Sequence, residues 1–228
     1  MKSKIFFFIV FFCNLKLANA EQIVFKATEI QTKEQGNIII GIGKAEAKTN
    51  TGLEIFANKF TYNKNKKILI ANGEVRAINK LKNIEIKSNI IEYNELSQIL
   101  TSFDFTEINI NNKYFIETKN IYYEYTKGDI SSNFFTKVTD LAKNKITTQQ
   151  FTFNQNDEIL KAKKIDIVDT ENNKYSLKNG ILSLKENLLL GKDIKINLTA
   201  KGFEVPDAEP RLKGNAIYYT DKKSLITK

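Results

Sequence analysis

Few residues of this sequence have side chains that could do chemistry. The chain has no histidine and a single cysteine, Cys13, which excludes an imidazole base, a thiol nucleophile after residue 13 and an ordinary zinc site. Asp166 and Asp169 stand three residues apart, and two carboxylates on a β-helix could serve a polysaccharide-active enzyme. No motif supports that chemistry. We therefore expect the two aspartates to lie in a solvated turn, and we expect no enzyme, cofactor or metal.

Basic residues outnumber acidic ones in this chain. The sequence holds 35 Lys and Arg against 26 Asp and Glu, a formal net charge of +9. Lys64, Lys66 and Lys67 form a basic hairpin tip, which either is a solvated turn or contacts anionic headgroups. The basic excess fits a compositional bias as well as it fits an anionic partner such as a phosphate-bearing lipid. No nucleic-acid partner is expected.

The first twenty residues have the layout of a secretory signal peptide. Two lysines in 1–4 precede a short apolar run, 5–13, and a small-x-small cleavage site follows at 18–20. The run is too short to span a bilayer. We expect cleavage before Glu21, so the only cysteine leaves with the signal and no disulfide framework remains.

A short phrase recurs along residues 21–228. An apolar residue is followed after two positions by a small or polar residue, after five by an apolar residue, and after seven by an aromatic one. Copies occur at 55–62, 86–93, 116–123, 146–153 and 212–219. A weaker early copy spans 25–32, and 175–184 is a copy of blurred register. The last positions of the copies that end at 32 to 153 are 30 or 31 residues apart, which indicates a stacked repeat architecture.

Each repeat is expected to be a pair of β-strands. A polar turn and a second short strand follow each copy, the runs are rich in Ile, Phe, Tyr and Thr, and no long stretch has a 3.6-residue period. A hairpin of this size cannot bury its apolar face alone, so stacked copies must share a core. A parallel β-helix and an antiparallel two-sheet roll both satisfy this. The tight turn after each aromatic favours the roll: one all-β domain, 21–228, built from ~30-residue strand pairs.

The recurring apolar and aromatic positions are the expected interior of the roll. They are Phe60, Tyr62, Ile91, Tyr93, Ile121, Tyr123, Phe151, Phe153, Ile217 and Tyr219. Ordinary core packing and a groove open to lipid both require such residues, and the two readings stay open. The first copy has Thr32 in place of the closing aromatic, which predicts an edge strand near 22–30. The candidate partner-contacting residues of this edge are Ile23, Val24, Phe25 and Lys26.

Three stretches of the sequence resemble a known family. FKATEI, IFANKFTYNKNKKILIANGEVRA and EPRLKGNAIYY are similar to the OstA-like periplasmic domains of lipopolysaccharide transport. These occur as a free-standing bridge protein (LptA-like) and as the N-terminal domain of LptD-type assembly proteins. Residues 209–215 most resemble the stretch before the barrel in LptD-type proteins. The family's barrel and the cysteines that flank the domain in many members are absent here, and the chain ends within a copy. We therefore expect either a fragment or split form of an LptD-type protein or a short relative, and we favour the fragment.

The resemblance implies a function as well as a fold. It implies a roll (β-jellyroll or β-taco) whose apolar interior takes the acyl chains of lipopolysaccharide and passes them along rolls stacked end to end. The implied partners are lipopolysaccharide, an LptA-like bridge protein joined by strand addition, and an outer-membrane barrel with its lipoprotein plug. The implied location is the periplasm, in association with the outer membrane. The alternative is an exported structural or adhesive β-repeat protein with a solid core.

Overall fold

The structure, a computed structural model, describes residues 23–186, 188–199, 211–220 and 223–227. The expected signal peptide, 1–20, lies outside the described residues. Strands make up nearly all of the regular structure, and the helical content of the described residues is one 3-10 turn, η1 (Glu34–Gly36). The prediction of an all-β chain with almost no helix is confirmed. Within the described ranges, no helix is long and apolar enough to cross a membrane.

The strands follow one another with short connections. In chain order they are β1 (Val24–Lys26), β2 (Glu29–Lys33), β3 (Ile38–Lys48), β4 (Leu53–Asn63), β5 (Ile68–Asn79), β6 (Ile84–Asn94), β7 (Ile99–Ile110), β8 (Tyr114–Lys119), β9 (Tyr122–Glu124), β10 (Asp129–Ser132), β11 (Thr136–Asp140), β12 (Lys145–Thr148), β13 (Gln150–Asn154), β14 (Ile159–Val168), β15 (Lys174–Ser183), β16 (Leu188–Asn197), β17 (Arg211–Thr220) and β18 (Lys223–Thr227).

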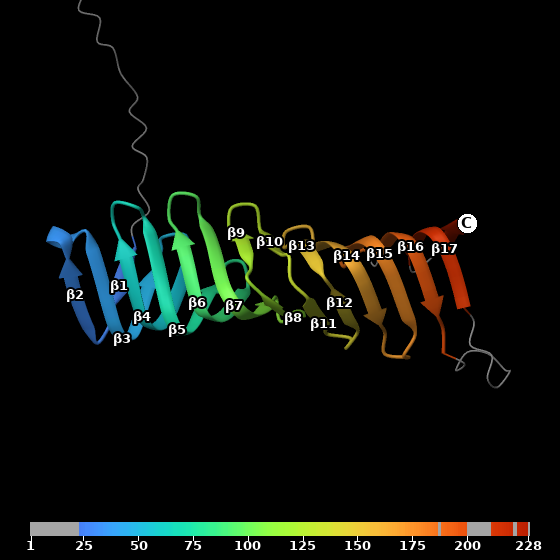
Figure 1. Ribbon diagram of the computed structural model, residues 1–228, viewed down its shortest axis with the longest axis horizontal. Coiled ribbons are helices and arrows are strands. Elements are labelled where there is room, and N and C mark those ends of the chain that lie inside the picture. The colour runs from blue at the N-terminus through green and yellow to red at the C-terminus, as the bar shows by residue number, and fades with distance from the viewer. Residues whose placement is uncertain (1–22, 187, 200–210, 221–222, 228) are drawn as a thin grey trace, which may run out of the picture.

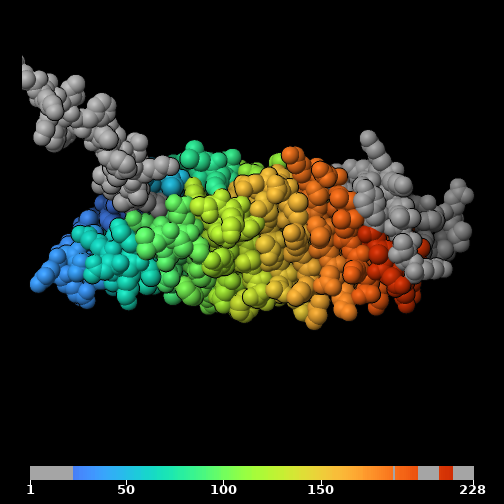
Figure 2. Space-filling model, turned by 90° about the horizontal axis from the view of Figure 1, so that it is seen from above, coloured from blue at the N-terminus to red at the C-terminus, as the bar shows by residue number. Residues whose placement is uncertain are grey.

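The strands form an antiparallel stack in chain order. The pairings run from β1 and β2 on β3, through β4, β5, β6 and β7, to β16, β17 and β18, and all are antiparallel. Figure 1 shows the strands side by side from one end of the molecule to the other, and Figure 2 shows the same order along an elongated body. The structure therefore agrees with the antiparallel roll and not with the parallel β-helix.

Most long strands belong to two layers at once. Residues 38–42 of β3 pair with β2, whereas residues 46–48 pair with β1. We call the layer that contains β2, β9, β10, β13 and β18 the first layer, and the layer that contains β1, β8, β11 and β12 the second layer. Each remaining strand has one half in each layer. The sequence predicted short strands, but several strands are 10 to 12 residues long because each crosses the roll from one layer to the other.

The crossing point is a bend near the middle of each long strand. The register shifts there between neighbouring strands, as between Phe56 and Lys59 of β4 and between Asn72 and Val75 of β5. Non-glycine residues with positive φ mark the bends at Lys44, Glu74, Asp104, Asn120, Lys164 and Asp193. Bulges of this kind bend a strand and increase its local twist. The two layers meet along the line of bends, which we call the vertex. On the opposite side, the hairpin turns of one layer face those of the other, and we call this side the mouth.

The copies of the phrase lie in register with one another. In each copy the first apolar residue lies in the second layer, and the apolar and aromatic residues five and seven positions later lie in the first, as Ile86, Ile91 and Tyr93 do. The copy of blurred register, 175–184, obeys the same rule, because Tyr175 lies opposite Ile167 and Leu182 opposite Leu160. Gly180 occupies the position where other copies carry a large apolar residue. The repeat is hard to recognise in the sequence there because Gly180 has no side chain, although the strand pairs in the same register as in the other copies.

Candidate functional site

Nine of the ten interior candidates have described side chains, and these nine are buried. Phe60, Tyr62, Ile91, Tyr93, Ile121, Tyr123, Phe151, Phe153 and Ile217 all belong to the first layer, and none is more than 5% exposed. Of Tyr219, which lies in β17, only the backbone belongs to the described part. The nine described side chains join one apolar cluster with the second-layer residues that face them. Whether lipid touches any of them stays a prediction.

Large and small residues alternate along the interior row next to the vertex. Following the cross-strand partners along the first layer, the row reads Gly41, Phe60, Ala71, Ile91, Ser102, Ile121, Ser132, Phe151, Ala162, Gly180, Gly191 and Ile217. A large side chain on one strand can cover a small one on the next. The Phe60 ring lies over Gly41, where an added Cβ would come within 2.3 Å of a ring atom.

The row contains three small residues in succession at Ala162, Gly180 and Gly191. The space over them is filled from the second layer: an added Cβ at Gly180 would lie 2.7 Å from Ile165, and one at Gly191 would lie 2.0 Å from Leu177. The interior is therefore packed at this place, although its large first-layer residue is missing. Side chains of the second layer fill the space that the small first-layer residues leave.

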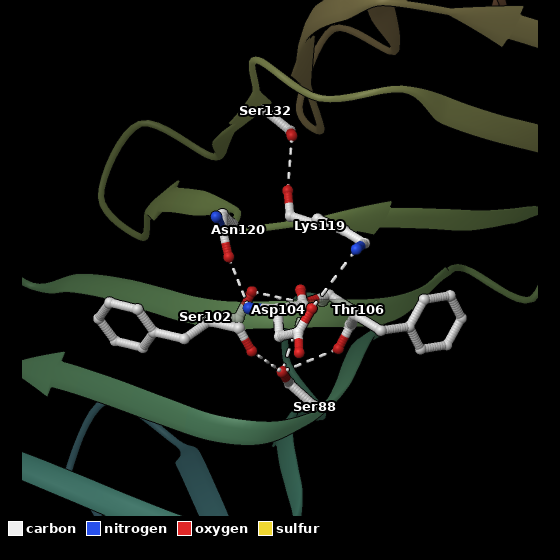
Figure 3. A network of polar contacts seen from close by, with 9 residues as sticks. Ser88, Ser102, Asp104, Thr106, Lys119, Asn120 and Ser132 are labelled. Atoms are coloured by element: carbon white, nitrogen blue, oxygen red, sulfur yellow. Dashed lines mark hydrogen bonds and ion pairs between the residues drawn. The ribbon is translucent and has the colours of Figure 1, made fainter.

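Hydroxyl side chains line the vertex in the middle of the molecule (Figure 3). Thr118 contacts the Ser132 hydroxyl at 3.1 Å and the Thr136 hydroxyl at 2.7 Å, and Ser132 also donates to the Lys119 carbonyl at 2.7 Å. These positions are buried. The bends remove backbone hydrogen bonds from the ladder, and small hydroxyls can replace them where the layers are too close for larger groups. This explains the small or polar residue two positions into each copy.

The polar groups of the vertex are satisfied. The Ser102 hydroxyl accepts from the Ile121 amide at 3.1 Å, and Thr148 donates to the Lys163 carbonyl at 2.6 Å. Among the described residues, no buried side-chain nitrogen or oxygen lacks a hydrogen-bond partner. Because its hydrogen bonds are satisfied, this polar seam can lie beside the apolar interior without leaving unpaired buried groups.

Interior tyrosines turn their hydroxyls toward the mouth. Tyr62 donates to the Glu95 carboxylate, which also accepts from the Lys67 amine at 3.3 Å. Tyr123 donates to Gln155 Oε1 at 3.2 Å. Burial, the main cause, raises the pKa of Tyr123 well above its ordinary value. Each of these rings therefore lies in the core while its hydroxyl reaches the turn of the next repeat, which makes the border of the interior polar.

Contacts across the mouth join the two layers. Tyr114 of the second layer donates to Glu158 of the first at 3.1 Å, and Lys113 lies 3.8 Å from the same carboxylate. Burial, with Glu158 as the next cause, raises the pKa of Tyr114 to about 12. Tyr125 of the first layer donates to the Thr51 carbonyl of the second at 2.6 Å. The sequence did not predict these pairs, since their partners are 44 and 74 residues apart.

The N-terminal edge candidates lie on β1 or beside it. Val24 is 53% exposed, and Lys26 lies 3.9 Å from Glu46. Phe25 points inward instead, with its ring centroid 4.7 Å from that of Phe60, and Ile23 is partly buried. Within the described ranges β1 and β2 pair with β3 alone. The backbone edge is therefore available, but Phe25 closes this end of the interior.

The aspartate pair and the basic hairpin tip have ordinary structural surroundings. Asp169 lies in the turn after β14, where its carboxylate accepts from the Glu171 and Asn173 amides at 2.9 Å. The prediction of a turn is wrong for Asp166, which lies within β14 because that strand continues to Val168, and which accepts from the Ser176 hydroxyl at 2.6 Å. Lys64, Lys66 and Lys67 occupy the turn between β4 and β5. In the part of the chain that the structure describes, no group of three or more His, Cys, Asp or Glu could hold a metal ion.

One sequence signal for the bends was missed. From the copy at 55–62 onward, every copy carries an amide between its small residue and its second apolar residue: Asn58, Asn89, Asn120, Gln149, Asn179 and Asn215. Asn120 shows a use for it, since its side-chain oxygen accepts from the Asp104 amide at 2.5 Å. Asn120 also has a positive φ of 47°, which asparagine tolerates better than most residues.

Among the comparisons with known proteins, the one with solved structures found likenesses. No protein-family profile matches the chain, and no curated protein matches it. The chain is similar to the solved structure of LptH from Pseudomonas aeruginosa, described as the LptA-homologous periplasmic component of the conserved lipopolysaccharide transport device. The two are 13% identical, the match covers 65% of this chain and 94% of that chain, and the TM-score is 0.28. The function of this chain must therefore be inferred from its own interior, mouth and edges.

Proposed function

We propose that the chain transports lipopolysaccharide in the periplasm, by sheltering acyl chains in the interior of the roll and passing them along rolls stacked end to end. The observation that carries the proposal is the buried apolar cluster of the interior, to which first-layer residues from Phe60 to Ile217 contribute along the stack. An acyl chain that crosses water needs continuous apolar shelter, worth ~0.8 kcal/mol for each methylene kept from water. A row that continues from strand to strand can supply it.

The ends of the stack support the second half of the proposal. Within the described ranges, β1 and β2 pair only with β3, and β18 pairs only with β17. Each end therefore presents a strand edge, and such edges accept a further strand through backbone hydrogen bonds. A bridge protein of the same architecture could add at the β1 edge, and an outer-membrane assembly partner at the other.

A second function is favoured by the packing of the interior. Ile91 and Ile121 are 0% exposed, and Tyr93 and Tyr123 are 1% exposed, as in the solid core of a structural β-repeat protein. For the transport function to hold, the two layers must separate at the mouth when lipid enters. The two functions therefore differ in whether the interior opens.

Site-specific photo-crosslinking in cells separates the two functions. Benzoylphenylalanine at Tyr93 or Tyr123 should give lipopolysaccharide adducts if the interior takes lipid, because both side chains face the core beside the mouth. Thr152, which points outward from the first layer, is the matched control and should give few. Equal yields at the inner and outer positions, or no adducts at the inner ones, would exclude the transport function.

A further inference from the structure

Five residues tie the two layers together across the middle of the mouth. Tyr125 and Gln155 come from turns of the first layer, and Thr51, Asn79 and Lys82 come from the second-layer rim. The Tyr125 hydroxyl donates to the Thr51 carbonyl at 2.6 Å and accepts from the Asn79 amide at 2.5 Å. Gln155 donates to the Lys82 carbonyl. We call these five residues the latch.

Three of the five latch residues are buried although the latch lies at the rim, and Thr51 and Lys82 are half-buried. Asn79 is 0% exposed, Gln155 is 7% exposed and Tyr125 is 8% exposed. The Tyr125 ring also packs on the Tyr123 ring of the interior, with 6.1 Å between their centroids. Opening the mouth here would break hydrogen bonds between buried groups and uncover the tyrosine row beneath them, so the latch holds the interior shut.

Lys82 is the charged member of the latch, and its partners are neutral. Its amine donates to the Tyr125 carbonyl and lies 4.4 Å from the centroid of the Tyr125 ring. Among the described residues, no carboxylate forms an ion pair with it, whereas the nearby rim lysines Lys80 and Lys113 pair with Glu54 and Glu158. Burial lowers the pKa of Lys82. An anionic oxygen would be a stronger partner for this amine than the carbonyl that it now contacts.

We propose that the latch is the gate through which the roll takes up amphiphiles, and that an anionic headgroup opens it by drawing Lys82 away from Tyr125. The ligand class is an acyl chain that carries a phosphate or carboxylate at its end. The headgroup would pair with Lys82 at the rim while the chain enters beside Tyr123. This inference rests on the proposed function, since it assigns a place and a trigger for the opening that transport requires.

Hydrogen–deuterium exchange tests the latch without any ligand. In residues 21–228, Tyr125→Phe removes the hydroxyl that bonds Thr51 and Asn79 and keeps the ring. Amides of 49–53 and 79–83 should then exchange about tenfold faster than in the parent, since each lost hydrogen bond weakens closure. Lys127→Met is the control, because Lys127 lies in the same turn and pairs with Glu124 instead. Unchanged exchange in Tyr125→Phe would overturn the latch.

Binding of two amphiphiles tests the trigger. Monododecyl phosphate and dodecyl maltoside have the same chain, and calorimetry below their micellar concentrations gives both affinities. Lys82→Met should lower the affinity for monododecyl phosphate at least tenfold and should not lower the affinity for dodecyl maltoside. Lys127→Met should change neither affinity. Monododecyl phosphate should also speed exchange at 79–83 in the parent.

The outcomes separate this inference from the function on which it rests. If both amphiphiles bind but Lys82→Met keeps its affinity for monododecyl phosphate, the trigger is wrong and the transport function stands. If neither amphiphile binds to the parent or to Tyr125→Phe, the transport function and the trigger both fail. In that case faster exchange in Tyr125→Phe would still show a structural strap across the mouth.

Discussion

Replacing Ile121 with alanine measures how tightly the interior is packed. Ile121 is 0% exposed, belongs to the apolar cluster of the interior and lies in the middle of the stack. The change removes three carbon atoms, worth ~0.8 kcal/mol each in transfer from water. A cavity term adds to this when the surroundings relax only in part. We expect the free energy of unfolding to fall by about 3 to 4 kcal/mol.

Thermal unfolding followed by circular dichroism is the assay. For a domain of this size the change corresponds to a melting temperature lower by roughly 6 to 16 °C, at ~2–4 °C for each kcal/mol. Ile181→Ala is the matched control: Ile181 is 40% exposed on the outer face of the same layer, and its loss should cost less than about 0.5 kcal/mol. If Ile121→Ala melts like the parent, the interior is not packed around Ile121. Lost lipid binding at an unchanged melting temperature would then indicate an open groove.

Three further predictions concern the vertex, alkaline pH and the N-terminal edge. Thr118→Val should lower the free energy of unfolding in urea by about 1 to 3 kcal/mol because the Ser132 and Thr136 hydroxyls lose a partner, and Thr118→Ser should recover most of it. Stability should fall as pH rises from about 10 to about 12, because unfolded Tyr114 loses its proton near 10 whereas the folded side chain keeps it to about 12. Tyr114→Phe should make this fall shallower in a pH series of urea melts, and an identical fall would contradict the assignment. Val24→Pro should reduce pull-down of an LptA-like bridge protein and leave the β spectrum intact, since proline is tolerated best at an edge. Undiminished pull-down would place the docking edge elsewhere.

Much of the fold follows from the spacing of apolar residues. Positions five and seven of each copy share a parity, so they face the same side of a strand. Their recurrence in Ile91 and Tyr93, and again in Ile121 and Tyr123, predicted both the stack and its inner face. The turns after Tyr62 and Phe153 were predicted because Asn, Lys, Asp and Glu follow directly there.

The bends could not be predicted from the same pattern. The first apolar residue of a copy, such as Ile86, and the second, Ile91, differ in parity, and both are nevertheless buried. A bulge between Ser88 and Ile90 reconciles them by turning the strand into the other layer. The difference in parity between Ile86 and Ile91 indicates an irregularity of the strand between them, and the amide side chain of Asn89 is typical of a bend. The direction of the bend depends on the neighbouring strands.

The sequence by itself determined the repeat, the strand pairs and the residues that face inward, because these depend on spacing within one strand and its nearest hairpin. The tertiary structure alone decided how the two layers meet. The contact of Tyr125 with Thr51 spans 74 residues, and the filling of the space at Gly191 by Leu177 depends on the distance between strands and layers. Such contacts arise only after the sheet has folded on itself, when each side chain meets partners that no local pattern specifies.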